Sequence, residues 1–443
     1  MNITCRDISK IIHNRYYTDS EIDTAIATLK KNGVSETKIR KLRFKKFFHR
    51  RIKSLAPFEP EKTIVGNPDI ATLIDTPATS DEILLISHEM SLTGAPRALL
   101  TLAVTLKDEG YRPTILTLAD GSLSEEARKN GIPVLVTDKE LVNPFVPTLL
   151  YEKEKTLIQK LINRFPKVVY NTIVSVDMFH DLIDTNKSVI WIHEAGIVYD
   201  NLRSDRDKIV DAIKNNRTNW VVGAHALNML NRAMGTTTDA TIFLYGIPPL
   251  EDVAHIEIPE LPHDKINIMI SGMMSQRKGT DTLLGAIKTL SKEEADRIMI
   301  HIVGGSCESN ITREINKAHK SVKWWGEQSH DFVLAIMKKM DMLICPSIYD
   351  PMPIVCTEAF QQSIPVVTSD ATGTAALITP GVDGMIFEAG KSDAVAKILR
   401  QIIAIPPAKL KDMGKNGNNI YRKNFTLEVF KKNVEKYFPP IGR

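Results

Sequence analysis

The stretch ILLISHEMSLTGAPRALLTLAVTLKDEGYRPTILTL, residues 83–118, contains two short apolar runs with an amphipathic segment between them. The apolar runs predict strands at Ile83–Ser87 and Thr114–Leu118, and the segment Pro96–Asp108 predicts a helix. Continuous apolar strands that are joined through a helix are typical of a parallel sheet covered on both faces. This stretch therefore predicts an α/β fold.

The same alternation of strand and helix fills two blocks, which a Pro-containing polar break, LPHDK at 261–265, separates. In the first block, further strands are expected at Pro133–Val136, Val168–Tyr170, Val189–Ile192, Trp220–Val222 and Thr241–Leu244, with a helix at Arg203–Asn215. In the second block, strands are expected at Ile266–Ile270, Met299–Val303, Val322–Trp324, Met342–Cys345 and Pro365–Thr368. Two such blocks predict two doubly wound, Rossmann-like domains that face a cleft, where a ligand is expected to bind.

We expect five segments along the chain. They are a basic helical extension at 1–56, a Pro- and Thr-rich linker or irregular strand pair at 57–80, a first domain at 81–262, a second domain at 263–424, and a C-terminal helix at 425–443 that crosses back to the first domain.

The composition is that of a soluble globular protein, with 43% hydrophobic and 25% charged residues among 443. The N-terminus has no apolar core of a signal peptide, and no apolar run approaches the ~18–20 residues that span a membrane. The cysteines are Cys5, Cys307, Cys345 and Cys356, without C-x-x-C or zinc-type spacing. They predict free thiols in a reducing cytoplasm, and we expect neither a disulfide framework nor a metal site.

Residues 1–56 carry 14 Lys and Arg against 5 Asp and Glu, whereas the whole chain has a net charge of only +4. Within this extension, the basic segment 36–57 places apolar residues roughly on one helical face. Such a helix can lie on an anionic membrane surface, or it can pack on the catalytic core or on a partner protein. Nucleic acid is not an expected partner, because no recognised binding module accompanies the charge.

The sequence IYDPMPIVCTEAF at 348–360 gives the strongest functional signal. If a helix begins near Pro351 or Pro353, the N–H groups of Ile354 and Val355 can hold a phosphate. Asp350 and Glu358 would then lie ~12 Å apart along the helix and could bind opposite ends of an elongated ligand. A nucleotide sugar has this shape. The alternative is a solvated helix with two surface carboxylates.

Two glycine-containing loops follow expected strands. In SGMMSQRKGTDTLLGAIK at 271–288, Arg277 and Lys278 are placed to neutralise a diphosphate, or they form an exposed cationic turn. In SHEMSLTGAPRALLTLA at 87–103, Gly94 lets the backbone approach a phosphate or a sugar closely, although the loop lacks a dinucleotide fingerprint.

Three further strand ends carry candidate residues. His193, in IWIHEAG at 190–196, can donate a hydrogen bond to a sugar or phosphate, and its alternative is a structural histidine. In VTSDATGTAALI at 367–378, Gly373 and Thr374 cap the donor sugar or form an ordinary turn. At 324–327, WWGE, the indole of Trp325 flanks a nucleobase or fills the core, and Glu327 is its neighbour.

Together these motifs resemble the retaining glycosyltransferases of family 4, which have the GT-B fold, from about residue 83 to the C-terminus. The family's Glu-x7-Glu element matches PSIYDPMPIVCTEA at 346–359, and its phosphate-binding loop matches GMMSQRKG at 272–279. Its strand end "V.F.G" matches VKWWG at 322–326, its N-terminal glycine loop matches TGA at 93–95, and its linker strand matches LYGIP at 244–248. The specificity of the resemblance comes from five matches in the family's order.

The resemblance implies a role for each matching residue. Glu358 would bind the ribose hydroxyls, Asp350 would contact the donor sugar, and Lys278 would hold the diphosphate and stabilise the leaving group. Gly94 would offer its amide to the phosphate, and His193 would contact the donor. Cations and helix N-termini would neutralise the diphosphate without a metal ion, and no cofactor other than the nucleotide sugar is expected.

The implied function is metal-independent transfer of a sugar, with retention, from a nucleotide diphosphate sugar to a glycan or lipid-linked acceptor. This activity would serve polysaccharide or glycoconjugate synthesis in the cytoplasm, with possible peripheral contact at the inner face of the membrane. Three positions depart from the family pattern, because Asp350 replaces Glu, Met273 replaces Arg and Pro353 replaces Gly. They leave open a non-catalytic subunit that supports a partner enzyme, and also a nucleotide-sugar epimerase.

Overall fold

The computed structural model describes residues 68–137, 149–194, 206–250, 253–306 and 308–442, together with short pieces between 26 and 42. Of the expected N-terminal extension, residues 26–31 and 37–39 are helical. The rest of the extension, including most of the basic segment 36–57, lies outside the described residues.

The first domain is built on a seven-stranded parallel sheet in the order β3-β2-β1-β4-β5-β6-β7. Its strands are β1 Glu82–Ser87, β2 Arg112–Thr117, β3 Val134–Val136, β4 Lys167–Asn171, β5 Ser188–Ile192, β6 Thr218–Val221 and β7 Thr241–Ile242. Its helices are α5 Gly94–Asp108, α6 Ser122–Lys129, α7 Leu149–Arg164, α8 Ile173–Phe179, α9 Arg206–Asn215 and α10 Ala224–Met234, with a 3-10 turn at His180–Leu182. The strand and helix predictions for this block are confirmed within a few residues.

The second domain is built on a six-stranded parallel sheet in the order β10-β9-β8-β11-β12-β13. Its strands are β8 Ile266–Ser271, β9 Ile298–Val303, β10 Val322–Gly326, β11 Met342–Cys345, β12 Val366–Ser369 and β13 Gly384–Phe387. Its helices are α11 Thr280–Ile287, α12 Lys292–Asp296, α13 Ser309–Asn316, α14 His330–Met337, α15 Ile354–Gln361 and α16 Ser392–Ala404, with a 3-10 helix, η5, at Gly373–Leu377. The edge strand β13 was not predicted.

The expectation of a linker or irregular strand pair at 57–80 is wrong for its second half. Residues Pro68–Asp75 form a helix, α4, which packs against α7. Proline is tolerated at the first position of a helix, because its missing N–H has no intrahelical partner there. Ile70 is buried in the core of the first domain, so a buried apolar contact adds to the stability of this short helix.

Strand order changes direction at one point in each sheet, between β1 and β4 and between β8 and β11. In open α/β sheets, ligands bind at the carboxyl ends of the strands that flank such a switch point. The loops after β1, β8 and β11 carry Gly94, Lys278 and Asp350, respectively. The topology therefore places three of the predicted site residues where a ligand site is expected.

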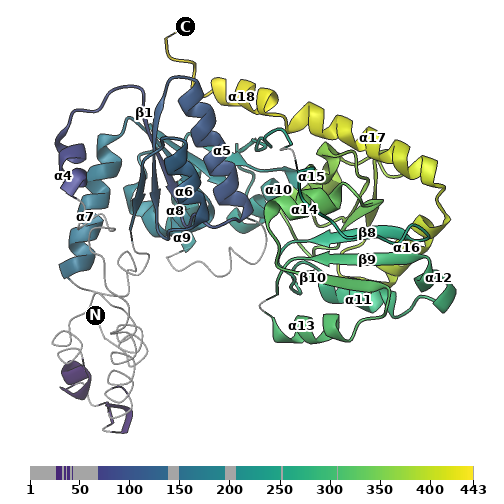
Figure 1. The fold of residues 1–443 in the computed structure, drawn as a ribbon. Coiled ribbons are helices and arrows are strands. Elements are labelled where there is room, and N and C mark those ends of the chain that lie inside the picture. Colours follow the sequence, from purple (N-terminus) through teal and green to yellow (C-terminus); the bar gives the residue numbers. More distant parts are fainter. Residues whose placement is uncertain are drawn as a thin grey trace.

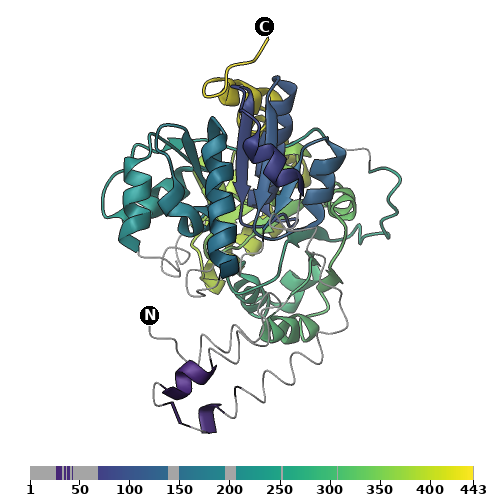
Figure 2. The ribbon, with the colours of Figure 1, turned by 90° about the vertical axis from the view of Figure 1, so that its left-hand side faces the viewer.

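Two C-terminal helices connect the domains on one side of the molecule (Figure 1). Helix α17, Pro407–Asn424, packs against α15 and β13 of the second domain, and α18, Leu427–Glu435, packs against α5 of the first domain. Figure 2 shows the same arrangement from the side of the first domain. Close to this crossing, Ile247 pairs with Thr426, and the Ile247 N–H donates to the Phe425 carbonyl at 2.8 Å.

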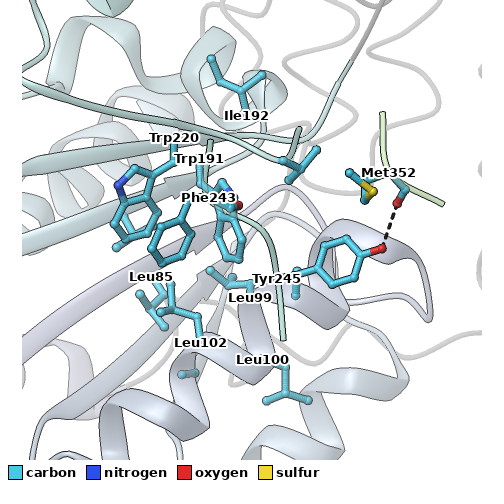
Figure 3. Close-up of a cluster of buried hydrophobic side chains, with 14 of the residues drawn as sticks. Leu85, Leu99, Leu100, Leu102, Trp191, Ile192, Trp220, Phe243, Tyr245 and Met352 are labelled. Atoms are coloured by element: carbon cyan, nitrogen blue, oxygen red, sulfur yellow. Dashed lines mark hydrogen bonds between the residues drawn. The ribbon is translucent and has the colours of Figure 1, made fainter. Parts of the chain in front are cut away.

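A cluster of aromatic side chains packs the end of the first domain's sheet against α18 (Figure 3). The rings of Trp220 and Phe243 are stacked with centroids 3.8 Å apart, and Trp191 meets both of them edge-on. Phe430 of α18 lies parallel to Trp191, with the centroids 6.3 Å apart. Tyr245 extends the cluster toward the second domain, because its hydroxyl donates to the carbonyl of Met352 at 3.2 Å.

Candidate functional site

The loops at the carboxyl ends of β8, β9 and β11 pack directly against one another. Gly279, at φ +68°, approaches the backbone of Pro346 so closely that a Cβ atom would overlap the Pro346 carbonyl oxygen. Gly304 meets the carbonyl of Gly272 in the same way. Both positions need glycine for space as well as for a left-handed backbone. The sequence motif around Gly279 thus serves to bring its basic loop against the end of β11.

Lys278 and Asp350 form an ion pair in this region. The Lys278 Nζ lies 2.5 Å from the Asp350 Oδ2, and the Arg277 guanidinium lies 3.7 Å from the same oxygen. Burial opposes the charge of Lys278, but the Asp350 carboxylate and the Cys345 side chain together outweigh burial and raise the pKa of Lys278 above its ordinary value. Lys278 is therefore held as a cation at neutral pH.

Backbone contacts fix the position of Asp350. Its N–H donates to the Ala371 carbonyl, and its own carbonyl accepts from the N–H of Gly373. Gly373 also sits so close to Pro351 that a side chain could not be accommodated. Thr374, 1% exposed, directs its hydroxyl to the sulfur of Met352. The predicted residues Gly373 and Thr374 thus pack against the loop that carries Asp350.

Helix α15 begins next to this ion pair. Pro353 is its N-cap residue, so Ile354 and Val355 occupy the first turn and their N–H groups have no intrahelical acceptor. A proline was expected within the first turn of this helix. Instead, Pro353 lies one residue before the first helical residue, and Pro351 lies three residues before it. Glu358 lies on the second turn, and its Oε1 is 2.8 Å from the Nε2 of His330. The positive end of the helix and the Glu358 carboxylate are separated by about one turn. The expected spacing of ~12 Å along the helix between Asp350 and Glu358 is wrong, because the helix begins at Ile354 and Asp350 lies in the loop before it.

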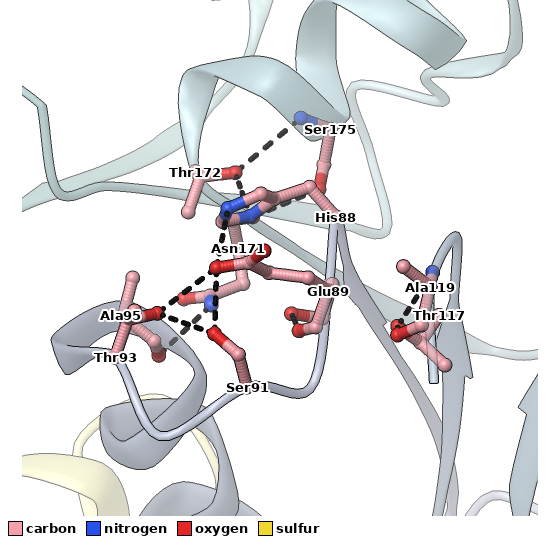
Figure 4. Close-up of polar contacts among 11 residues, drawn as sticks. His88, Glu89, Ser91, Thr93, Ala95, Thr117, Ala119, Asn171, Thr172 and Ser175 are labelled. Carbon is pink, nitrogen blue, oxygen red and sulfur yellow. Dashed lines mark hydrogen bonds and ion pairs between the residues drawn. The ribbon is translucent and has the colours of Figure 1, made fainter. Parts of the chain in front are cut away.

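The first domain contributes Gly94, the first residue of α5. A Cβ atom on Gly94 would lie 3.4 Å from the Cδ1 of Ile354, so the two helix N-termini of different domains are in contact. Hydrogen bonds hold the Gly94 loop in place (Figure 4). The hydroxyl of Thr93 donates to Glu89, and the Asn171 side chain donates to the carbonyl of Ala95.

His193 follows β5, and Trp191 packs against its ring. Its Nε2 is buried and has no hydrogen-bond partner among the described residues. Burial, with a smaller contribution from His88, lowers the pKa of His193 to about 3, so the imidazole is neutral at physiological pH. A neutral ring can donate or accept a single hydrogen bond at Nε2, which suits a hydroxyl group.

Glu194 was not selected from the sequence, although it directly follows His193. Its Oε2 accepts the N–H groups of Ile173 and His193, both at 3.0 Å. Burial raises the pKa of Glu194 to about 7, although these hydrogen bonds act to lower it. Nearby, Thr172 adopts φ +87° and its hydroxyl lies 3.1 Å from the Nδ1 of His88 (Figure 4). Backbone strain of this kind is common at functional sites.

His225, on α10, is a second residue that sequence reasoning missed. Its Nε2 is buried without a partner within the described part of the chain. Burial lowers its pKa, and the charges of Asp350 and Asp370 act against that shift from the other domain. Gly223, just before α10, faces Met352, since a Cβ there would lie 2.8 Å from the Met352 Cε. No motif marked His225, because the carboxylates that act on its charge, Asp350 and Asp370, lie far along the chain.

The indole of Trp325 is used in packing. It lies against Phe332, with ring centroids 5.6 Å apart, and its Nε1 donates to His301. The ammonium of Lys323 lies 3.7 Å above the ring. The core-filling alternative therefore describes Trp325 better than an open nucleobase platform. Glu327 is exposed and lies beside Gly305 at the end of β9.

Cys345 and Cys356 are free, as predicted, and the structure shows that both are buried. Cys5 and Cys307 lie outside the described residues. Within the described ranges, no group of three or more His, Cys, Asp or Glu side chains is arranged to hold a metal ion. The helices of the same ranges include none with the length and hydrophobicity that a bilayer crossing requires.

Two family models match the chain. The model "Glycosyl-transferase family 4" matches residues 79–220, and "Glycosyl transferases group 1" matches residues 253–420.

Among curated relatives, an uncharacterized 41.2 kDa protein in the cps region of Klebsiella pneumoniae is 25% identical over 158 residues, which cover 36% of this chain and 42% of that protein. The lipopolysaccharide core biosynthesis glycosyltransferase LpsE of Rhizobium meliloti is 23% identical, over 33% of this chain and 42% of LpsE. The chain thus matches less than half the length of either relative.

Solved structures share the fold. The Anabaena HepE structure in complex with UDP and glucose has a TM-score of 0.65 at 16% identity, and covers 80% of this chain and 98% of HepE. WaaG, a glycosyltransferase involved in lipopolysaccharide biosynthesis, has a TM-score of 0.59 at 14% identity, and covers 82% of this chain and all of WaaG.

Two Rossmann-like domains, with strand ends that meet at the N-terminus of α15, define the GT-B fold. The chain belongs to glycosyltransferase family 4.

Proposed function

We propose that this protein transfers a sugar, with retention, from a nucleotide diphosphate sugar to a glycan or lipid-linked acceptor in polysaccharide or glycoconjugate synthesis. One observation carries the proposal: the cations of the β8–α11 loop lie beside Asp350 at the start of α15, and Gly94 of the other domain touches that helix start. This arrangement combines positive charge, free N–H groups and both domains at one place.

In the proposed reaction, Lys278, Arg277 and the N–H groups of Ile354 and Val355 neutralise the diphosphate. Charge that develops on the departing diphosphate is then stabilised by groups already in position, which lowers the barrier without a metal ion. Asp350 holds the two cations and contacts the donor sugar. Glu358 binds the ribose, and His193 offers Nε2 to a sugar hydroxyl.

The acceptor hydroxyl attacks the anomeric carbon on the face that the diphosphate leaves. The new glycosidic bond forms as the bond to the diphosphate oxygen breaks, and the hydroxyl proton passes to the leaving phosphate. The structures of HepE with UDP and with UDP-glucose support a nucleotide-sugar donor by similarity of fold. We further propose a cytoplasmic location with peripheral membrane contact through the basic segment 36–57.

Nucleotide release from a panel of nucleotide sugars, with glycan and lipid-linked acceptors, tests the proposal. We expect release that depends on the acceptor, a product with the donor's anomeric configuration by NMR, and unchanged rates in EDTA. The variant Glu358→Ala should lose this activity. A protein that neither binds nor consumes any donor would contradict the proposal.

A non-catalytic subunit is the second candidate, and Met273 favours it. This side chain is 50% exposed at the position where the family has an arginine, so one phosphate contact is missing. Turnover that requires a partner chain would support this candidate, whereas turnover by the isolated protein would exclude it. Formation of an isomerised nucleotide sugar without an acceptor would indicate an epimerase instead.

A further inference from the structure

His330 contacts Glu358, the proposed ribose-binding residue. It is the first residue of α14, directly after the N-cap Ser329, whose hydroxyl accepts the Phe332 N–H. The Nε2 of His330 lies 2.8 Å from the Oε1 of Glu358. The Glu358 side chain is only 10% exposed, whereas that of His330 is 51% exposed. An almost buried carboxylate is thus held from one side by an imidazole that reaches the surface.

The charged groups around His330 come from three helices. Glu358 is on α15, Asp331 is on the same helix as His330, and Arg97 is on α5 of the first domain. The hydrogen bond to Glu358 raises the pKa of His330, while burial and Arg97 act in the opposite direction. Arg97 is itself paired with Glu126, through bonds of 2.7 and 2.8 Å. His330 therefore stays protonated at a higher pH than a free imidazole.

We propose that His330 is a positioning residue, which orients the Glu358 carboxylate toward the ribose hydroxyls of the donor and makes donor binding depend on pH. This inference rests on the proposed function. A protonated imidazole that donates to Oε1 fixes the plane of the carboxylate and leaves Oε2 to accept from the ribose diol. Such charge-assisted bonds are roughly twice as strong as neutral ones, so the carboxylate is held firmly.

The sign of the pH dependence follows from the charge. Below the raised pKa, His330 carries a positive charge that holds the Glu358 carboxylate in place for the ribose hydroxyls. As pH rises through that pKa, the charge is lost and donor affinity should fall. Burial raises the pKa of Glu194 to about 7, so this carboxyl group can add its own pH dependence to donor binding. Only the difference between wild type and a His330 variant isolates the contribution of His330.

The test is calorimetric titration of the full chain with UDP and with 2′,3′-dideoxy-UDP, which lacks the ribose hydroxyls. We expect His330→Ala to weaken UDP binding about tenfold, the size of one charge-assisted hydrogen bond, and to leave dideoxy-UDP binding unchanged. His330→Gln, which keeps an uncharged donor, should bind UDP with intermediate affinity. At high pH, the UDP affinities of His330→Gln and wild type should become equal, because His330 is then uncharged as well.

His263→Gln is the matched control, because His263 also pairs with a glutamate, Glu260, at 3.2 Å, but at a fully solvated site before β8. This variant should bind both nucleotides as wild type does. Equal weakening of UDP and dideoxy-UDP by His330→Ala, or no weakening of either, would overturn the positioning role while the proposed function stands. If wild type binds none of UDP, GDP and ADP, the proposed function fails, and this inference fails with it.

Discussion

The ion pair between Lys278 and Asp350 shows how single residues shape the candidate site. An isolated buried cation is costly, and Asp350 compensates for that cost at 2.5 Å. Arg277, half-exposed at 3.7 Å from the same oxygen, adds positive charge where the family pattern has lost an arginine at Met273. The Asp350 carboxylate thus balances the charge of both cations. We infer that an incoming diphosphate shares them with Asp350.

Replacing Lys278 tests this arrangement at the residue scale. If Lys278 stabilises the leaving diphosphate, Lys278→Met should lower kcat by about 10²- to 10³-fold, the loss typical of removing one preorganised electrostatic contact. Steady-state kinetics with the preferred donor measures it. The control is Lys288→Met, which removes an exposed pair with Glu314 at 2.6 Å in the same domain and should leave kcat unchanged. Equal kcat values for the two variants would contradict the assigned role.

At the scale of elements, apolar runs predicted the strands from β1 to β12, and most of these strands are buried. The exceptions are the edge strands β3, β7 and β10, which have no buried residue. Strand β13, GMIF at 384–387, was missed because it begins at a glycine that directly follows the turn-forming residues TPGVD at 379–383. Helix α4 was missed because Pro68 suggested a loop, whereas it is the first helical residue.

Site residues could be predicted where they follow a strand, since all parallel strands end at one edge of the sheet. The loop glycines, Lys278 and Asp350 belong to this class. His330 and His225 could not be predicted in this way. His330 pairs with Glu358 of another helix, and the carboxylates that act on the charge of His225 belong to loops of the other domain. Tertiary packing alone brings such residues together.

Gly279 allows a prediction at this scale. Gly279→Ala should unfold or displace the Lys278 loop, because a Cβ would overlap the Pro346 carbonyl in addition to straining a φ of +68°. Gly381→Ala is the matched control, since it has a φ of +81° but no atom within 4 Å of the added methyl group. We expect a clearly lower melting temperature for Gly279→Ala than for Gly381→Ala in a thermal denaturation experiment. Similar values would mean that steric overlap is unimportant.

At the scale of the whole molecule, α18 belongs to the second half of the sequence but packs on the first domain. Phe430 is 1% exposed and lies in the aromatic cluster with Trp191 and Phe243. Lys431 pairs with the buried Glu109 of the first domain. In the segment after α18, the carbonyl of Pro439 accepts a hydrogen bond from the Tyr111 hydroxyl. The first domain is therefore completed by residues that follow the second.

Phe430→Ala should destabilise the protein by about 3–5 kcal/mol, the usual cost of removing a buried aromatic side chain. Denaturant unfolding followed by tryptophan fluorescence measures this change, because Trp191 lies against the ring. Val382→Ala, at a side chain that is 51% exposed, is the control and should change stability by less than about 1 kcal/mol. A small effect of Phe430→Ala would show that α18 contributes little to the first domain.

The pairing of Ile247 with Thr426 places the outgoing and returning chain side by side. The two domains are thus joined by two adjacent chain segments. Two adjacent connections favour hinge rotation of the domains about a single axis over independent reorientation. A protease that cuts one of these two segments would leave the other intact. The nicked fragments would then remain at a high effective concentration for one another, and the protein would survive the cut as an assembled pair.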